Sequence, residues 1–173
     1  VLPPTVLGFY VLVAYSPQNA FGKFLETTLH LRLAFSFEGI LVASIIFSLP
    51  FMIQPLVNGF ELIPKSYREA AYTLGKSPFT TFMKVLMPNI RPSILTGVAM
   101  TFAHCIGEFG LVIMVGGNMP GETRVASVAI YDAVQLMDYS TANKYSLILF
   151  LISLAILSLI YGFNGKKKED VRN

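Results

Sequence analysis

Long apolar runs alternate with polar segments along this chain. Three of the runs, residues 39–57, 92–115 and 145–163, are long enough to cross a bilayer as helices, which takes about 20 residues. A fourth run, residues 1–15, is shorter, and we interpret it as part of a span that the sequence enters partway. The pattern predicts an all-α fold, a polytopic transmembrane helix bundle with four spans.

Prolines mark the ends of two of these spans. Pro50 and Pro55 lie near the end of the 39–57 run, where they are expected to kink the helix. Pro92 suits the first turn of the 92–115 span, because a helix leaves its first N–H groups without partners anyway.

Composition agrees with lipid as the solvent. The 173 residues are 54% hydrophobic and 13% charged, whereas soluble domains carry about a quarter charged residues. The net charge of +3 does not indicate nucleic acid, because the basic residues are not clustered with aromatic ones. Cys105 is the only cysteine, which excludes an intrachain disulfide and a metal site built from several cysteines.

Lysine and arginine predict the orientation of the spans. Nine of the 13 basic residues lie in the loop 58–91 and in the tail 164–173, and four lie in the segments 16–38 and 116–144. Cytoplasmic segments carry the excess of basic residues. We therefore expect residues 1–163 to form a single transmembrane domain whose loop 58–91 and basic tail are cytoplasmic.

One of the outward segments predicts a short helix over residues 124–137. Its apolar side chains recur at helical spacing and predict one apolar stripe: Ala126, Ile130, Ala133, Val134 and Met137.

The loop 58–91 predicts a helix–turn–helix. Ser66 and Glu69 have the spacing of a capping box, and we expect the helix to run to Leu74 and to end at Gly75 in the left-handed conformation.

A second helix in this loop is expected to begin at Ser77 with Pro78 in its first turn. Pro88 is expected to end it before Pro92 opens the next span.

A cluster of small residues gives this loop a second interpretation. Taken singly, Glu69 indicates only a helix cap, and Ala70 and Ala71 are ordinary helix residues. Taken together, two adjacent small side chains let another backbone come close, while Gly75 permits a sharp turn.

The spacing resembles the ATPase-docking motif of bacterial ABC-importer permeases. Val85 and Met87 replace the Ile and Leu that are usual in that motif, and both remain apolar. The resemblance implies that a cytoplasmic ATPase docks on Glu69, Ala70, Ala71, Gly75, Val85 and Pro88.

Other segments resemble the permeases for molybdate, tungstate and sulfate. These are residues 107–110 and 117–124, and residues 2–8 and 35–39 are similar to the molybdate permeases in particular. The similarity extends to about Phe163. Molybdate permeases usually have one more span before this region.

Two ionisable residues lie within the span 92–115. His104 and Glu108 are four apart and would share a helix face, with Glu108 roughly 24 Å along the helix from Pro92. A charge near the bilayer centre costs about 2.5–3.5 kcal/mol on insertion scales. Relatives commonly place an Arg at the position of His104, so an Arg–Glu pair there would be a His–Glu pair here.

Two interpretations of this region stay open. Glu108 either pairs with His104 or caps loosened backbone amides, or the region is a gate of the translocation path. The gate would consist of His104, Gly107, Glu108 and Gly110.

The resemblance implies a permease subunit of an ATP-driven importer for molybdate or tungstate in the bacterial inner membrane. It implies a homodimer or paired permease, cytoplasmic ATPase subunits, a periplasmic binding protein and surrounding lipid, with no nucleic acid. The chain has no Gly-rich phosphate loop, so we expect it not to be an enzyme and to contain no catalytic residue. We expect ATP and Mg²⁺ on the partner ATPase, and no cofactor or metal on this chain.

Two alternatives remain. The cargo could be sulfate or thiosulfate, because selectivity is expected to lie mainly in the binding protein. An autonomous channel or a membrane-embedded enzyme is the other alternative, although only His104 and Glu108 offer candidate catalytic groups.

Overall fold

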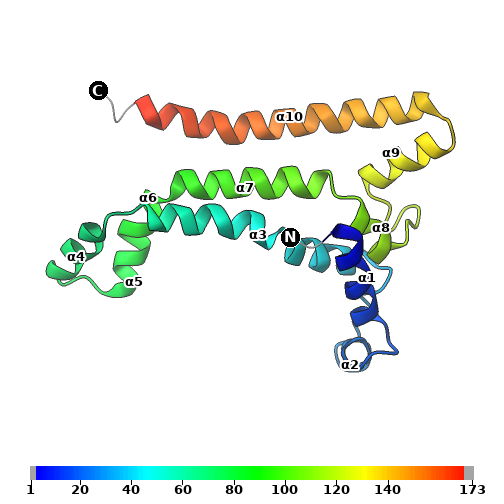
Figure 1. The fold of residues 1–173 in the computed structure, drawn as a ribbon, viewed down its shortest axis with the longest axis horizontal. Coiled ribbons are helices and arrows are strands. Elements are labelled where there is room, and N and C mark those ends of the chain that lie inside the picture. Colours follow the sequence, from blue (N-terminus) through cyan, green and yellow to red (C-terminus); the bar gives the residue numbers. More distant parts are fainter. Residues whose placement is uncertain (1–2, 170–173) are drawn as a thin grey trace. The chain divides into compact units, whose positions relative to one another are not determined.

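The computed structural model describes the backbone of residues 3–169 and the side chains of residues 3–162. All regular secondary structure within these residues is helical (Figure 1), which confirms the all-α prediction. The elements are α1 (Pro4–Tyr15), α2 (Ala20–Thr28), α3 (Phe37–Glu61), α4 (Lys65–Thr73), α5 (Pro78–Thr81), the π-helical turn η1 (Phe82–Leu86), α6 (Met87–Asn89), α7 (Arg91–Ile106), α8 (Gly110–Gly116), α9 (Ala126–Gln135) and α10 (Tyr139–Glu169).

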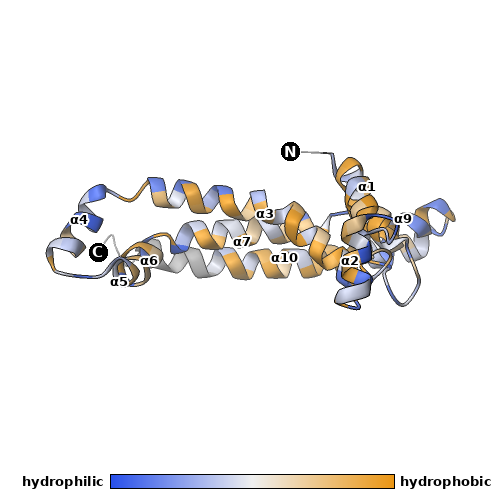
Figure 2. Cartoon of the chain, turned by 90° about the horizontal axis from the view of Figure 1, so that it is seen from below, coloured by the Kyte–Doolittle hydropathy of each residue, from blue (hydrophilic) through white to orange (hydrophobic). Residues whose placement is uncertain are grey.

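Two helices in the described part of the chain are long and apolar enough to cross a membrane, namely α3 and the Tyr139–Gly162 part of α10. α7 and α8 would together form a third, bent by 60° at the break between them. α1 is apolar but has only 12 residues. Figure 2 shows the hydrophobic stretches of α3, α7 and α10, and the hydrophilic residues over much of α4.

The single continuous helix expected over residues 92–115 is wrong. The helix breaks after Ile106 and resumes at Gly110. Gly107 lies in this break and Gly110 directly follows it. Because glycine costs about 1 kcal/mol in a helix interior relative to alanine, the local sequence favours the interruption.

The other two spans are longer than expected. α3 begins at Phe37 and continues through Pro50 and Pro55 to Glu61. α10 begins at Tyr139 because Asp138, directly before it, accepts a hydrogen bond from the backbone N–H of Thr141 at 3.1 Å. In the tail 164–173, the basic side chains, Arg172 included, lie outside the described residues.

The chain divides into two compact units. Among the described residues, the first unit contains residues 3–48 and Cys105–Leu154. The second unit contains Leu49–His104 and the described residues from Ala155 onward. α3, α7 and α10 contribute residues to both.

The first unit has the larger apolar core. Its buried members come from α1, α3, α8 and α9 and from the segment before α3: Tyr15, Leu33, Ala34, Ile40, Ala43, Phe47, Leu111, Val112, Val115 and Val128.

α1 and α8 lie side by side within this unit (Figure 1). Two glycines allow the close approach. A Cβ at Gly8 would lie 3.0 Å from the Cβ of Met114 and 3.1 Å from the Cα of Leu111, and one at Gly110 would lie 3.0 Å from the Cγ2 of Thr5. The absence of side chains at Gly8 and Gly110 therefore brings the two backbones together.

In the second unit, the first helix of the loop 58–91 departs from the expected cap. α4 begins at Lys65 after Pro64, and no described side chain makes a capping hydrogen bond there. Ser66 lies inside the first turn, so the predicted Ser66–Glu69 capping box is wrong. Pro64 already supplies a fixed φ of −58° just before the helix. The left-handed end is confirmed, because Gly75 has a φ of +68°.

The second helix of this loop begins as expected. The Oγ of Ser77 accepts the N–H of Thr80 at 3.2 Å, with Pro78 as the first helical residue.

Pro88, in contrast, does not end that helix. Helical turns continue to Asn89, by way of the π turn η1. Pro88 has no N–H to donate to the carbonyl of Lys84, and its ring would clash with that carbonyl in α geometry. The wider π turn accommodates this mismatch, and α7 then begins at Arg91, next to the expected Pro92.

The short helix predicted over residues 124–137 is present as α9. Its buried residues are Val128 and Ala133, whereas Val134 is 42% and Met137 is 78% exposed. The prediction of a helix is confirmed for Ala126–Gln135. Val134 lies on this helix, whereas Met137 lies beyond its end, so the predicted helix is two residues too long there.

Candidate functional site

A groove in the second unit is the first candidate site. It has a volume of about 500 Å³, and we call it the loop groove. α4, the turn after it and η1 supply its lining, which consists of Ser66, Tyr67, Ala70, Ala71, Leu74, Lys76 and Val85.

Three of the six predicted docking residues line the loop groove. Ala70 and Ala71 come from α4, and Val85 comes from η1, fourteen positions farther along the chain than Ala71. The structure thus brings together residues that are separated in sequence. Ala71 is buried, at 5% exposure, so its small side chain packs within the loop.

The other three predicted docking residues lie outside the lining. Glu69 is exposed, and its backbone carbonyl accepts the hydroxyl of Thr73 at 2.9 Å. Pro88 is exposed on α6. Gly75 forms the turn, and no described atom lies within 4 Å of where its Cβ would be.

Large apolar side chains are exposed close to the loop groove in the sequence. Leu74, which lines the groove, is 74% exposed, and Phe79 on α5 is 72% exposed. Exposed large apolar side chains close to one another are typical of an interaction site, although Phe79 is not part of the groove lining. Lys76 adds a positive charge to the lining.

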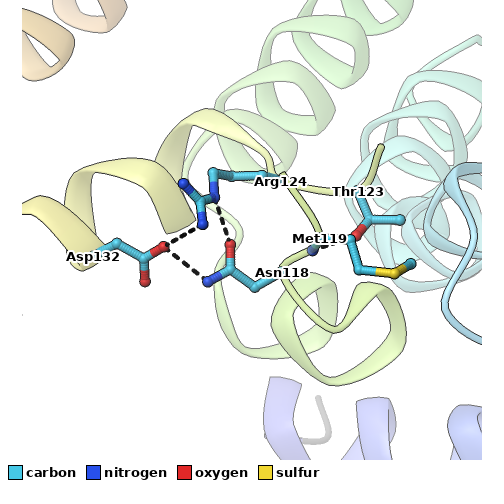
Figure 3. Close-up of polar contacts among 5 residues, drawn as sticks. All are labelled: Asn118, Met119, Thr123, Arg124 and Asp132. Carbon is cyan, nitrogen blue, oxygen red and sulfur yellow. Dashed lines mark hydrogen bonds and ion pairs between the residues drawn. The ribbon is translucent and has the colours of Figure 1, made fainter. Parts of the chain in front are cut away.

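A second candidate site, which is polar, lies in the first unit, where the turn between α8 and α9 meets α9 (Figure 3). The Nε of Arg124 donates to the Oδ1 of Asn118 at 2.9 Å, and the Nδ2 of Asn118 donates to the Oδ2 of Asp132 at 2.8 Å. The Nη2 of Arg124 lies 3.4 Å from the same Asp132 oxygen. The charge of Arg124 is therefore matched within the chain.

Thr123 holds the same turn from inside. Its hydroxyl donates to the carbonyl of Gly116 at 2.6 Å and accepts the N–H of Met119 at 2.9 Å. Thr123 is 3% exposed, so these bonds fix the turn that carries Asn118 and Arg124.

The break between α7 and α8 contains a buried carboxyl group. Glu108 is 5% exposed and lines a pocket of about 250 Å³, which we call the Glu108 pocket. The remaining lining residues come from the surrounding helices and from Val125, directly before α9: Ile40, Ser44, Cys105, Ile106, Val112, Val125, Ala126, Ser127 and Leu149.

The backbone carbonyl of Glu108 is hydrogen-bonded, whereas its carboxyl group is not well hydrogen-bonded. Its backbone carbonyl accepts the hydroxyl of Ser127 at 2.6 Å. Neither carboxyl oxygen makes a hydrogen bond of good geometry to any described residue, although the Ser44 side chain lies within interaction distance.

The predicted helix face shared by His104 and Glu108 is wrong, because α7 ends at Ile106. His104 is a helical residue whose ring stacks on Phe51, with centroids 4.0 Å apart, whereas Glu108 lies in the break. Gly107 is in the break as well, and Gly110 begins α8 against α1. No three His, Cys, Asp or Glu side chains of the described residues are grouped to hold a metal ion.

Comparison with known protein families decides the identity at the level of the family. The profile of the family described as "Binding-protein-dependent transport system inner membrane component" matches residues 1–165. The chain belongs to this family. It is a permease component of an ABC-type transport system.

Curated relatives of this permease carry two kinds of name. The chain is 44% identical over 161 residues to the molybdenum transport system permease protein ModB of Azotobacter vinelandii, which covers 93% of this chain and 71% of that protein. It is 36% identical over 168 residues to a probable sulfate transport system permease protein of Nephroselmis olivacea, covering 97% of this chain and 59% of that protein. A similar protein of Chlorella vulgaris is 36% identical over 166 residues, with coverages of 96% and 62%. The permease thus spans less than two thirds of the length of these two sulfate relatives.

Sequence reasoning missed two residues that shape these sites. Ser127 and Thr123 hold the permease backbone at Glu108 and Gly116 through their hydroxyls. A Thr that closes a turn rich in Gly and Asn was the available signal for the second. No comparable local signal points to Ser127, because its partner is 19 residues earlier in the chain.

Proposed function

We propose that this chain is the permease subunit of an ATP-driven importer that moves molybdate or tungstate across the bacterial inner membrane. A second copy or a closely related permease would complete the path, ATPase subunits would bind ATP and Mg²⁺ on the cytoplasmic side, and a periplasmic binding protein would deliver the anion.

The loop groove is the observation that supports the coupling role. It gathers Ala70, Ala71 and Val85, three positions of the docking motif, into one mainly apolar concave surface. In the proposal, a helix or turn of the ATPase inserts here, and closure of the ATPase pair moves the loop 58–91 together with the spans joined to it. Loop and tail are cytoplasmic in this arrangement, in keeping with their nine basic residues.

Filling the loop groove tests the docking role. Ala70→Trp places a bulky side chain in the lining, and Thr73→Trp places the same side chain on an exposed position of α4 that is not part of the lining. We expect Ala70→Trp to lose co-purification of the ATPase and anion-stimulated ATP hydrolysis, and Thr73→Trp to keep both. Equal assembly and hydrolysis in the two variants would refute docking at the loop groove.

Molybdate or tungstate is the preferred cargo because the molybdenum permease relative is 44% identical, against 36% for the two sulfate relatives above. Sulfate or thiosulfate is the second candidate, supported by the names of those relatives. Competition for uptake of radiolabelled molybdate decides between them. Excess tungstate should block uptake and excess sulfate should leave it intact, whereas strong inhibition by sulfate would favour the second candidate.

The region around the α7–α8 break is proposed as a gate element. His104, Gly107, Glu108 and Gly110 lie at or beside a bent pair of helices, and irregular backbone at membrane depth is tolerated only where it is buried in protein or lines a cavity. An autonomous channel would pass anions in vesicles that contain the permease alone. The proposal requires that such vesicles be tight without the ATPase.

A further inference from the structure

The Glu108 pocket contains an ionisable carboxyl group, and its surroundings offer that group few hydrogen bonds and no neighbouring positive charge among the described residues. Glu108 is 5% exposed, and both of its carboxyl oxygens lack a well-formed hydrogen bond to the described residues. Moving an ionised carboxylate into apolar surroundings is so costly that such a group is normally paired or neutralised.

The helices packed around this carboxyl supply no cation to it among the described residues. Cys105 is the one other titratable residue in the lining, and its Sγ lies 2.9 Å from the Oγ of Ser48. In and directly before α9, the charged residues are Arg124 and Asp132, and these two pair with each other.

The ionisable residues at the ends of the neighbouring helices do not line the pocket either. Glu38 on α3 and Lys144 on α10 are exposed, and Asp138 interacts with Thr141. His104, on α7, stacks on Phe51. Compensation by a basic side chain of this chain is therefore absent from the described part of the Glu108 pocket.

A bound metal ion would be poorly served by this pocket. Hard cations such as Ca²⁺ and Mg²⁺ take six or more oxygen ligands, waters included. Besides the carboxyl group, the lining side chains offer the hydroxyls of Ser44 and Ser127, and the hydroxyl of Ser127 already donates to the backbone carbonyl of Glu108. The other lining side chains are apolar, apart from Cys105.

We propose that the Glu108 pocket is a proton-binding site, in which the carboxyl group of Glu108 binds a proton and is neutral. The proton bonds to one carboxyl oxygen, so the group becomes an O–H donor, and the hydroxyl of Ser44 is the acceptor in reach. No other bond is made or broken.

The site lies at the bend between α7 and α8, so its charge matters for the gate. A neutral carboxylic acid removes the repulsion that a carboxylate would exert on an anion. This consequence for transport rests on the proposed function, whereas the binding of the proton does not.

Labelling of the unmodified permease in lipid tests the site directly. Dicyclohexylcarbodiimide, an apolar reagent, adds to protonated carboxyl groups in apolar surroundings, and a water-soluble carbodiimide reaches exposed ones. At neutral pH we expect peptide mass spectrometry to find the apolar adduct on Glu108, to find little of the soluble adduct there, and to see the first decrease as the pH is raised. Absence of the apolar adduct from Glu108 at neutral pH would overturn the proposal.

Infrared spectroscopy of two variants gives a second readout without any transport assay. Glu108→Gln should lose the carbonyl band of a protonated carboxylic acid, and Glu122→Gln, at an exposed position, should keep it. An unchanged band in Glu108→Gln would also overturn the proposal, and the labelling still decides the matter if that variant does not fold. A negative ATPase-docking result with positive labelling would refute the proposed coupling and leave the proton site standing.

Discussion

At the level of single residues, Gly75 is needed for its backbone conformation and not for close packing. Its φ is +68°, and no described atom lies within 4 Å of an added Cβ. Gly75→Ala would therefore be strained only in the backbone, by about 1–2 kcal/mol. We predict that the amides of α4 exchange hydrogen about 5 to 30 times faster in this variant.

Gly75→Asn is the matched variant, because asparagine visits the left-handed region more readily than other residues. We expect it to exchange at a rate between those of the wild type and Gly75→Ala. The same rate in all three proteins would show that the turn does not limit the stability of α4.

Asp138 makes the start of α10 sensitive to acid. Hydrogen bonds from the side chain and the backbone N–H of Thr141 lower the pKa of this carboxyl group below its usual 3.8. Because the pKa is lower in the folded state, the stabilisation is complete above the unfolded value and is lost as the pH falls through the folded one.

We predict that Asp138→Ala lowers the thermal midpoint of the purified permease in detergent at neutral pH, and that the difference from the wild type shrinks below about pH 3.8. Asp138→Asn keeps a capping oxygen without the charge, so it should retain most of the stability and lose the pH dependence. A difference between wild type and Asp138→Ala that does not change with pH would contradict this assignment.

At the level of elements, the contact between α1 and α8 depends on a missing side chain. A Cβ at Gly8 would lie 3.1 Å from the Cα of Leu111, a backbone atom that cannot rotate away. Inserting a methyl group into such a contact typically costs about 1–3 kcal/mol. We predict that Gly8→Ala lowers the thermal midpoint in detergent.

Gly162→Ala is the control for this prediction. Gly162 lies in α10 with no described atom within 4 Å of an added Cβ, and alanine is favoured over glycine in a helix by about 0.5–1 kcal/mol. This variant should be as stable as the wild type or more so. If both variants shifted the midpoint alike, the cause would be helix propensity and not the α1–α8 contact.

Sequence patterns predicted the positions of the helices better than the breaks and turns between them. The positions of α3, α9 and α10 followed from apolar runs and helical spacing, and the turn at Gly75 and the start of α5 at Ser77 followed from local residue chemistry. The break after Ile106 and the π turn before Pro88 did not, because each is a compromise between a local helix breaker and the packing around it.

At the level of the whole molecule, basic residues predict which side of the membrane each segment faces. We predict that a membrane-impermeant thiol reagent labels Glu122→Cys in intact cells and labels Lys76→Cys only after the membrane is opened. Both positions are exposed, and both variants would be made in a Cys105→Ser background, so the two differ only in location. The reverse pattern would place the loop groove outside the cell and exclude an ATPase as its partner.

The candidate sites show the same division between what sequence can and cannot predict. Motif spacing selected Ala70, Ala71 and Val85 as docking candidates, and the fold places them in one groove, while their docking role stays a prediction. It did not foresee that Glu108 would leave the helix of His104, because helical spacing presumes a helix that continues. Nor could it indicate the pocket, whose walls come from five separate stretches of chain.

The close approach of α1 and α8 at Gly8 and at Gly110 has a mechanical consequence. At Gly8 an added Cβ would meet the Cα of Leu111 and the side chain of Met114, and at Gly110 it would meet Thr5 and Pro4, so little room is left for one helix to shift against the other. We therefore expect a tilt of α8 to carry α1 with it. A reporter group attached beside the paired rings of Phe9 and Tyr10 would register that tilt without touching the residues at the bend.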